Sequence, residues 1–271
     1  MTSLTPDQLR ALLPPLAALA RRAGAEVLRR YEGGFTVRAK ADDTPVTEAD
    51  EAAEAIILPA LAPLLPGVPA ISEEAAAKGQ APALNGARFW AVDPLDGTKE
   101  FIKRTGEFSV NIGLIDGGHP VLGVIYAPVT GLLYAAAGPG SAFRQRGDAA
   151  PEPIGARHAP DDGMVVLASR SHDNDQALRD RLAALPVRER RKMGSSLKFC
   201  LIAEAEADIY LRMGPTCEWD TAAGQAILEA AGGSVTQLDG SPMVYGKAAD
   251  GFLNPSFVAR GLAERKKGLA S

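Results

Sequence analysis

The chain has 271 residues, of which 46% are hydrophobic, and a formal net charge of −4. A chain of this length and apolar content can bury a full core, either as one large domain or as two of moderate size. The negative charge argues against a surface for polymeric nucleic acid, which needs clustered lysine and arginine. Small anionic ligands are still compatible with local groups of basic residues.

Neither a membrane span nor a disulfide framework is expected. No apolar run approaches the ~20 residues needed to cross a bilayer, and the first residues lack the pattern of a secretory signal. We therefore expect a cytoplasmic protein, or one held peripherally at the inner membrane. The two cysteines, Cys200 and Cys217, are expected to be reduced and to serve in packing.

The chain should begin with two helices separated by a short strand and a turn. Residues 5–8 have the form of a capping box with proline at the first helical position, which predicts a helix to about Arg30. Pro14 and Pro15 should kink or restart it. A strand at 35–39 and a turn at 42–45 follow.

Thr47 should cap the second helix, with Asp50 at its third position as the capping partner. The apolar face of this helix is expected to carry four residues: Ala52, Ala55, Ile56 and Ala60. A strand at 68–71 then ends in Glu73 and Glu74, and adjacent glutamates at such a position are usually solvated.

The stretch from Asp93 to Thr98 holds the strongest chemical signal. An apolar β-prone run leads into Asp93 and Asp96, two carboxylates that repel each other unless a cation lies between them. The Leu95 carbonyl can point the same way, and Gly97 allows a tight turn that brings Thr98 to the site. Oxygen ligands alone suit Mg²⁺ better than zinc. The alternative is a polar turn after a strand, since Asp, Pro and Gly are common turn residues.

An antiparallel meander is expected next, with strands at 109–115, 121–126 and 132–136. The region 149–160 is rich in proline, glycine and alanine and is the best candidate for a domain boundary. We therefore divide the chain into an N-terminal domain, 1–155, and a C-terminal domain, 156–271.

In the second half we expect a strand at 164–168, a helix at 175–184 and a strand from Val187 with a solvated basic run. Ser195 should cap a helix to about Ala205, and this helix start, with its hydroxyls and Lys198, favours an anion such as phosphate. A strand at 209–212 and a loop at 215–219 follow. Asp220 should then cap a helix at 221–231, before two further strands and a basic terminal helix.

Two runs resemble signatures of a known family. Residues 93–102 are similar to the metal-binding signature of the inositol-monophosphatase superfamily, and residues 98–102 resemble its 3′(2′),5′-bisphosphate nucleotidase branch. Residues 219–224 match the second signature of the family, and the likeness covers nearly the whole chain. It implies an α+β or α/β protein, a layered αβαβα sandwich of the inositol-monophosphatase/fructose-bisphosphatase type. Its N-terminal sheet would be antiparallel and its C-terminal sheet mixed.

The resemblance also implies roles for particular residues. Asp50 and Thr98 would act on the attacking water, and Glu73 would join them. Two or three Mg²⁺ ions would be held by five residues: Glu73, Asp93, Leu95, Asp96 and Asp220. Substrate would be contacted by eight: Asp96, Gly97, Thr98, His172, Ser195, Lys198, Arg212 and Asp220. Without the resemblance, His172 would be read as a surface histidine, Arg212 as a strand-end charge and Asp220 as a helix cap.

Together with the residues above, the resemblance implies a Mg²⁺-dependent phosphomonoesterase that removes the 3′-phosphate of adenosine 3′,5′-bisphosphate, and of its 5′-phosphosulfate form, to give the 5′-monophosphate AMP. The resemblance also implies inhibition by lithium. An inositol-monophosphate or broad sugar phosphatase is the alternative enzyme, and a non-catalytic nucleotide-binding regulator is the alternative from another class. We expect a monomer or homodimer whose partner is a small phosphorylated nucleotide.

Overall fold

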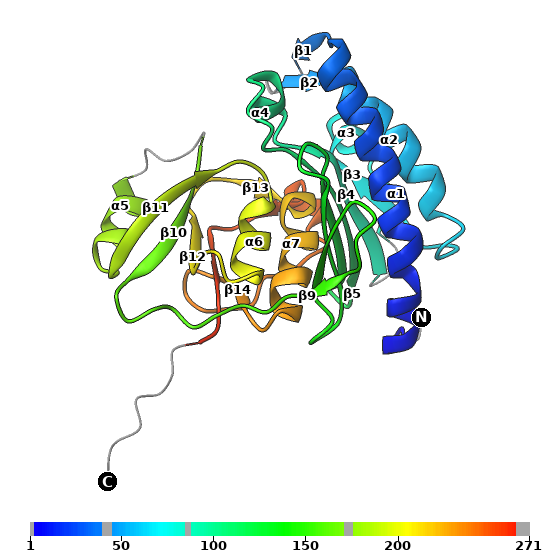
Figure 1. Ribbon diagram of the computed structural model, residues 1–271. Coiled ribbons are helices and arrows are strands. Elements are labelled where there is room, and N and C mark those ends of the chain that lie inside the picture. The colour runs from blue at the N-terminus through cyan, green and yellow to red at the C-terminus, as the bar shows by residue number, and fades with distance from the viewer. Residues whose placement is uncertain (1–2, 40–44, 85–87, 171–175, 264–271) are drawn as a thin grey trace.

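The computed structural model describes residues 3–39, 45–84, 88–170 and 176–263. Helices and sheets alternate in layers across this part of the chain (Figure 1): α1 and α2, a seven-stranded sheet, α6 and α7, a five-stranded sheet, and α5. The predicted αβαβα sandwich is confirmed. The apolar core between the two sheets is continuous, since buried residues of both sheets pack on α6 and α7.

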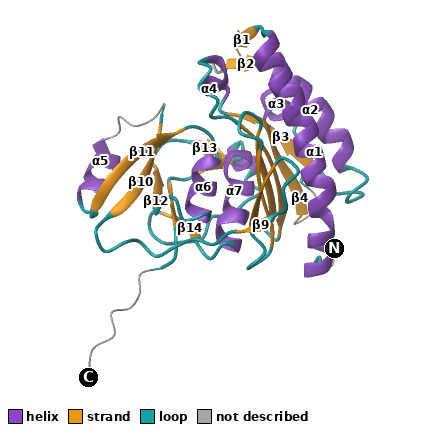
Figure 2. Ribbon diagram, in the orientation of Figure 1, coloured by secondary structure: helices purple, strands orange, loops and turns teal. Residues whose placement is uncertain are grey.

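Figure 2 shows the helices and strands of the described residues. The helices are α1 (Pro6–Gly33), α2 (Glu48–Leu61), α3 (Glu73–Ala77), α4 (Thr98–Ile102), α5 (Gln176–Ala183), α6 (Leu197–Ala203) and α7 (Glu218–Ala230), with a 3₁₀ turn at Ala248–Asp250. The strands of the first half are β1 (Val37–Ala39), β2 (Pro45–Thr47), β3 (Ala70–Ser72), β4 (Arg88–Asp96), β5 (Ser109–Asp116), β6 (His119–Ala127), β7 (Leu132–Ala137), β8 (Phe143–Arg146) and β9 (Glu152–Pro153). Those of the second half are β10 (Met164–Ser169), β11 (Val187–Met193), β12 (Ile209–Arg212), β13 (Thr216–Cys217), β14 (Ser234–Gln237), β15 (Leu253–Asn254) and β16 (Phe257–Arg260).

The seven-stranded sheet follows the order of the chain from β3 to β9. Its pairs are antiparallel except at one edge, where β3 runs parallel to β4 with Ala70 beside Trp90. The meander of β5, β6 and β7 is therefore confirmed, and the expectation of an entirely antiparallel sheet needs this one correction. The parallel pairing brings the carboxyl ends of β3 and β4 to the same edge, where Glu73 follows β3 and Asp93 lies in the last part of β4.

The five-stranded sheet has the order β11-β10-β12-β16-β14 and is mixed, as predicted. β10 is parallel to both β11 and β12, whereas β16 is antiparallel to β12 and β14. The carboxyl ends of the three parallel strands meet at one edge, where open sheets present ligands. Ser169, Gly194 and Arg212 stand at or beside these ends. The division at residue 155 stays a prediction.

Helices α1 and α2 cover the outer face of the seven-stranded sheet (Figure 1). The Thr5 capping box is present, and α1 runs without interruption through Pro14 and Pro15. The predicted restart is therefore wrong. Both prolines are exposed, and the leucines around them are buried against the sheet. This burial offsets the loss of backbone hydrogen bonds that proline causes.

The buried face of α2 differs from the predicted one. Its buried residues are Ala49, Asp50, Ala53, Ile57 and Leu61. The predicted set of Ala52, Ala55, Ile56 and Ala60 lies on the partly exposed and exposed sides. The helix is turned so that its acidic third residue faces inward, where the rest of the fold supplies partners for the carboxylate.

Helix α7 lies between the sheets with its backbone close to β5 and β6. A Cβ added at Gly123 would stand 2.3 Å from the Ala223 carbonyl oxygen, and one at Gly113 would stand 2.9 Å from the Ala222 Cβ. Any side chain at these positions would push the helix away from the sheet. The glycines therefore set the position of α7 and of the acid near its start.

Candidate active site

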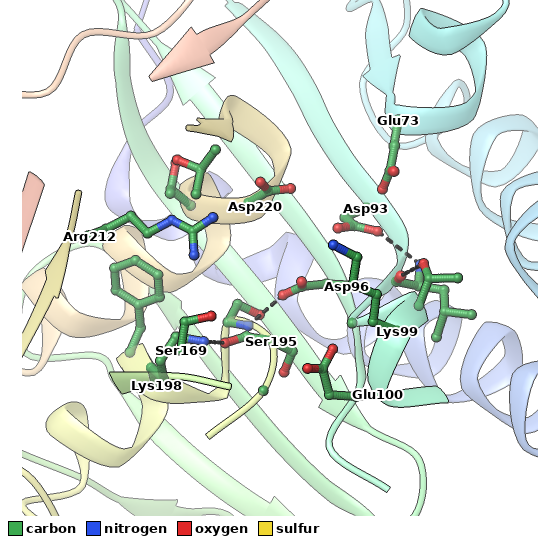
Figure 3. A pocket seen from close by; sticks show the side chains of 18 of the residues that line it. Glu73, Asp93, Asp96, Lys99, Glu100, Ser169, Ser195, Lys198, Arg212 and Asp220 are labelled. Carbon is green, nitrogen blue, oxygen red and sulfur yellow. Dashed lines mark hydrogen bonds between the residues drawn. The ribbon is translucent and has the colours of Figure 1, made fainter. Parts of the chain in front are cut away.

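A pocket of about 240 Å³ lies between the carboxyl ends of strands from the two sheets. One wall comes from α3 and from the end of β4 with the start of α4. The opposite wall comes from β10, β12 and the starts of α6 and α7. Figure 3 shows acidic side chains along the first wall and Lys198 and Arg212 on the second. Carboxylates and cations thus face the same small volume.

Five acids line the pocket (Figure 3), and four of them were singled out from the sequence: Glu73, Asp93, Asp96 and Asp220. Burial raises the pKa of Asp93 well above its usual range, and the charges of Glu73, Asp96 and Asp220 raise it further. Burial likewise raises the pKa of Asp220, and Asp96 and Glu73 add to the effect. The local negative charge is therefore not compensated by protein groups alone.

These acids fit a hard cation by their chemistry. Their ligand atoms are all oxygen, and the Leu95 residue between two of them also lines the pocket. In the described residues no three carboxylate, imidazole or thiol groups lie close enough together to hold a single metal ion as they stand. The acids line one pocket and supply the oxygen atoms that a hard cation prefers.

Asp50 and Thr98 are in contact. The Thr98 hydroxyl donates to Asp50 Oδ1 at 3.1 Å and lies 3.2 Å from the Leu95 carbonyl oxygen. Asp50 Oδ2 accepts hydrogen bonds from the Thr47 amide at 2.8 Å and from the Thr47 hydroxyl at 2.7 Å. The cap and the pairing with Thr98 therefore coexist. Thr98 lines the pocket, whereas Asp50 does not line it and is connected to it by its hydrogen bond with Thr98.

The start of α6 differs from the prediction. The helix begins at Leu197, and Ser195 precedes it with a left-handed backbone, φ 51°. Ser195 Oγ accepts a hydrogen bond from the Leu197 amide at 3.3 Å, so its side chain still serves the helix start. The Ser196 amide donates to the Asp96 carboxylate. This one amide is thus directed at a protein carboxylate, and anion binding by the rest of the helix start stays a prediction.

Lys198 is buried at the back of the pocket. Its ammonium donates to the carbonyls of Met193, at 3.2 Å, and Ser195, and lies 5.0 Å from the centre of the Tyr210 ring. Burial lowers the pKa of Lys198 to about 8, although the nearby charge of Asp96 opposes the shift. Lys198 is therefore a cation whose charge changes close to neutral pH.

Arg212 and Asp220 come from neighbouring elements and face the same cavity (Figure 3). Arg212 donates to the carbonyls of Gly214, at 3.2 Å, and Pro215, at 2.7 Å. Asp220 occupies the third position of α7, with its Oδ2 accepting from the Cys217 amide at 2.8 Å. Asp220 was predicted at the N-cap, which Cys217 holds instead. The predicted residue His172 lies outside the described residues.

Further residues of the site were not singled out from the sequence. Lys99, Glu100 and Ser169 line the pocket. Ser169 ends β10, and the strand-end rule that identified Asp93 could have found it. Asn111 lies behind the pocket, and a polar residue inside an apolar strand was a usable signal. Glu74 is buried, so the expectation that both glutamates are solvated is wrong for this one.

Comparison with known proteins gives the family. The family model for the inositol monophosphatase family matches residues 8–267. The 3′(2′),5′-bisphosphate nucleotidase CysQ of Escherichia coli K12 is 46% identical over 248 residues, covering 91% of this chain and 98% of that protein. The crystal structure of CysQ from Bacteroides thetaiotaomicron superposes with a TM-score of 0.73 at 37% identity, over 91% of this chain and 95% of that one. The inositol monophosphatase of Anabaena gives a TM-score of 0.73 at 28% identity, over 94% and 92% of the chains.

The chain belongs to the inositol monophosphatase family, which confirms the resemblance carried by residues 93–102 and 219–224. It is a phosphatase of this family, with an oxygen-rich acidic pocket where the family signatures lie. Cys200 and Cys217 are free, as expected. In the described residues no helix is long and apolar enough to cross a membrane.

Proposed function

We propose that this protein is a Mg²⁺-dependent 3′(2′),5′-bisphosphate nucleotidase that removes the 3′-phosphate of adenosine 3′,5′-bisphosphate to give AMP. Its 5′-phosphosulfate form is proposed as a second substrate. The observation that carries the proposal is one pocket in which the four predicted acids and the Thr98–Asp50 pair lie with Lys198 and Arg212. The names of the relatives, 3′(2′),5′-bisphosphate nucleotidase CysQ, support this substrate class.

Glu73, Asp93, Asp96, Asp220 and the Leu95 carbonyl would hold two or three Mg²⁺ ions. Bound Mg²⁺ would polarise the phosphoryl group and make water acidic enough to attack near neutral pH. The raised pKa values of Asp93 and Asp220 support this assignment, because burial first and repulsion between the acids second disfavour their negative charges, and a bound cation would offset both effects. Asp96, which lies between Leu95 and Gly97, is proposed to be shared between ions.

The chain itself would position the attacking water and take its proton. Thr98 Oγ1 already donates its proton to Asp50 Oδ1, so its lone pairs are available to accept from a water in the pocket. The water proton would pass to Thr98 as the Thr98 proton passes to Asp50. The two hydrogen bonds from Thr47 hold Asp50 in place for this transfer. Glu73, which lines the same pocket, completes the predicted catalytic set.

Recognition would come from the second wall. Lys198 and Arg212 present positive charge on the side of the pocket away from Glu73 and Asp93 (Figure 3), which suits the phosphate that is not cleaved. Gly97 and Ser195 line the same volume and are proposed as substrate contacts. Lys198 is buried, so a bound anion would be little screened by water.

A small substrate panel tests the proposal. Phosphate release is measured with adenosine 3′,5′-bisphosphate, inositol 1-phosphate and fructose 1,6-bisphosphate, each with Mg²⁺ or with EDTA. We expect the highest kcat/KM for the bisphosphate nucleotide and no turnover in EDTA. A preference for inositol 1-phosphate would instead select the inositol phosphatase alternative. Mg²⁺-independent release, or none on any substrate, would overturn the proposal.

A further inference from the structure

Asn111, the third residue of β5, holds one oxygen of the Asp96 carboxylate from behind the pocket. Its amide Nδ2 donates to Asp96 Oδ2 at 3.2 Å, and the Ser196 backbone amide donates to the same oxygen. One donor belongs to the seven-stranded sheet and the other to the start of α6. With Oδ2 held by two protein donors, Oδ1 is the oxygen left for a ligand in the pocket.

The orientation of the Asn111 amide is itself determined. Its Oδ1 accepts hydrogen bonds from the Ser196 hydroxyl at 2.8 Å and from the Ser109 hydroxyl at 3.0 Å. A flipped amide would turn its carbonyl oxygen toward the Asp96 carboxylate, and two acceptors would then face each other. Asn111 and Ser109 are fully buried and Ser196 is 3% exposed, so water cannot take over these bonds.

We propose that Asn111 is a positioning residue that fixes the Asp96 carboxylate for metal binding and thereby sets the Mg²⁺ affinity of the pocket. The inference rests on the proposed function of Asp96 as a metal ligand. Asp96 lies at the end of β4, where the pairing of β4 with β5 is irregular between Asp93 and Asp96. Regular backbone pairing therefore does not set its side chain, and the amide of the neighbouring strand does.

A structural role and a positioning role of Asn111 have different consequences when the residue is replaced. A purely structural role predicts that its loss lowers stability alone. A positioning role predicts that its loss also weakens Mg²⁺ binding, because the Asp96 carboxylate can then rotate away from the geometry that the ion needs. Hydrogen-bond partners of metal ligands typically change metal affinity by about 10- to 100-fold when they are removed.

The test compares Asn111→Leu with Gln225→Leu. Gln225 is also a buried amide with two side-chain hydrogen bonds, to Glu229 at 2.9 Å and from Tyr245 at 2.7 Å, and it does not line the pocket. Mg²⁺ affinity is measured by calorimetry with the metal alone, thermal unfolding gives stability, and kcat and KM are measured across a range of Mg²⁺ concentrations. Asn111→Ala is the second variant, since it leaves room for water beside the two serines and should fold if Asn111→Leu does not.

We expect Asn111→Leu to weaken Mg²⁺ binding by about 10- to 100-fold and to recover much of its turnover at high Mg²⁺. Gln225→Leu should lose stability with unchanged Mg²⁺ affinity. Wild-type affinity in both Asn111 variants would overturn the inference, as would an equal loss in Gln225→Leu. The calorimetry needs no turnover, so wild-type protein that binds Mg²⁺ without releasing phosphate would overturn only the proposed function.

Discussion

The lowered pKa of Lys198 leads to a quantitative prediction for substrate affinity. A lysine with a pKa of about 8 is a cation below that pH and loses its charge above it. About 90% of the molecules would carry the charge at pH 7 and about 10% at pH 9, from the ordinary titration of one group. If only the charged form holds the second phosphate, the apparent affinity falls in proportion, so KM should rise about tenfold between these pH values.

The assay compares adenosine 3′,5′-bisphosphate with 3′-AMP, which lacks the second phosphate, at saturating Mg²⁺ from pH 7 to 9. Both substrates are fully ionised over most of this range because the second phosphate pKa is about 6. The ratio of their KM values therefore isolates the Lys198 contribution from general effects of pH. Lys198→Ala should give a high ratio that does not change with pH. Lys198→Arg keeps its charge, so any residual affinity should also be independent of pH.

A KM ratio for the wild-type protein that stays constant from pH 7 to 9 would refute this reasoning. So would a Lys198→Ala variant that loses the same factor on both substrates, because that result would place Lys198 in the fold or in the chemistry.

Three other perturbations test other parts of the structure. Asp96→Asn should lower kcat by several orders of magnitude while the melting temperature is retained, and near-normal turnover at saturating Mg²⁺ would contradict its role. Millimolar LiCl should inhibit uncompetitively with respect to substrate, since Li⁺ matches Mg²⁺ in size but carries half the charge; equal effects of NaCl and KCl would point to ionic strength instead. Gly123→Ala should cost about 1–3 kcal/mol in urea unfolding because its Cβ would overlap the backbone of α7. Gly33→Ala, where a Cβ meets nothing within 4 Å, is the matched control and should be near neutral.

The features that were predicted correctly from the sequence are those that depend on residues close together in the chain. The Thr5 and Thr47 capping boxes depend on residues three positions apart, and both are present. The turn from Asp93 to Thr98 is also local, and its acids and Thr98 line the pocket as expected. Their roles as metal ligands and water-positioning group came from the family resemblance and are still to be tested.

The departures from prediction arise where distant residues decide the outcome. The inward face of α2 includes Asp50, which accepts a hydrogen bond from Thr98, 48 positions further along the chain. Helix α6 starts at Leu197, one residue later than a cap at Ser195 implies. At this start the Ser196 amide donates a hydrogen bond to Asp96, which lies 100 positions earlier in the chain. Neither partner can be recognised from the local run of residues. Asn111 did carry a local signal, as a polar residue inside an apolar strand, but its three hydrogen-bond partners come from β4, β5 and the start of α6 and could not be predicted from that strand.

The distribution of the pocket over two walls has a consequence for protein engineering. Most of the proposed reaction chemistry is encoded before residue 112 and most of the recognition after residue 168, so the two could be exchanged between relatives by a single crossover in the region between. Asp220 is the exception, because this proposed metal ligand lies on α7, in the part of the chain after residue 168 that otherwise supplies recognition. A chimaera would therefore need a compatible α7 surface, with glycines at 113 and 123 in one parent and small residues at 222 and 223 in the other. Relatives matched at these four positions are the parents in which substrate preference should transfer without loss of turnover.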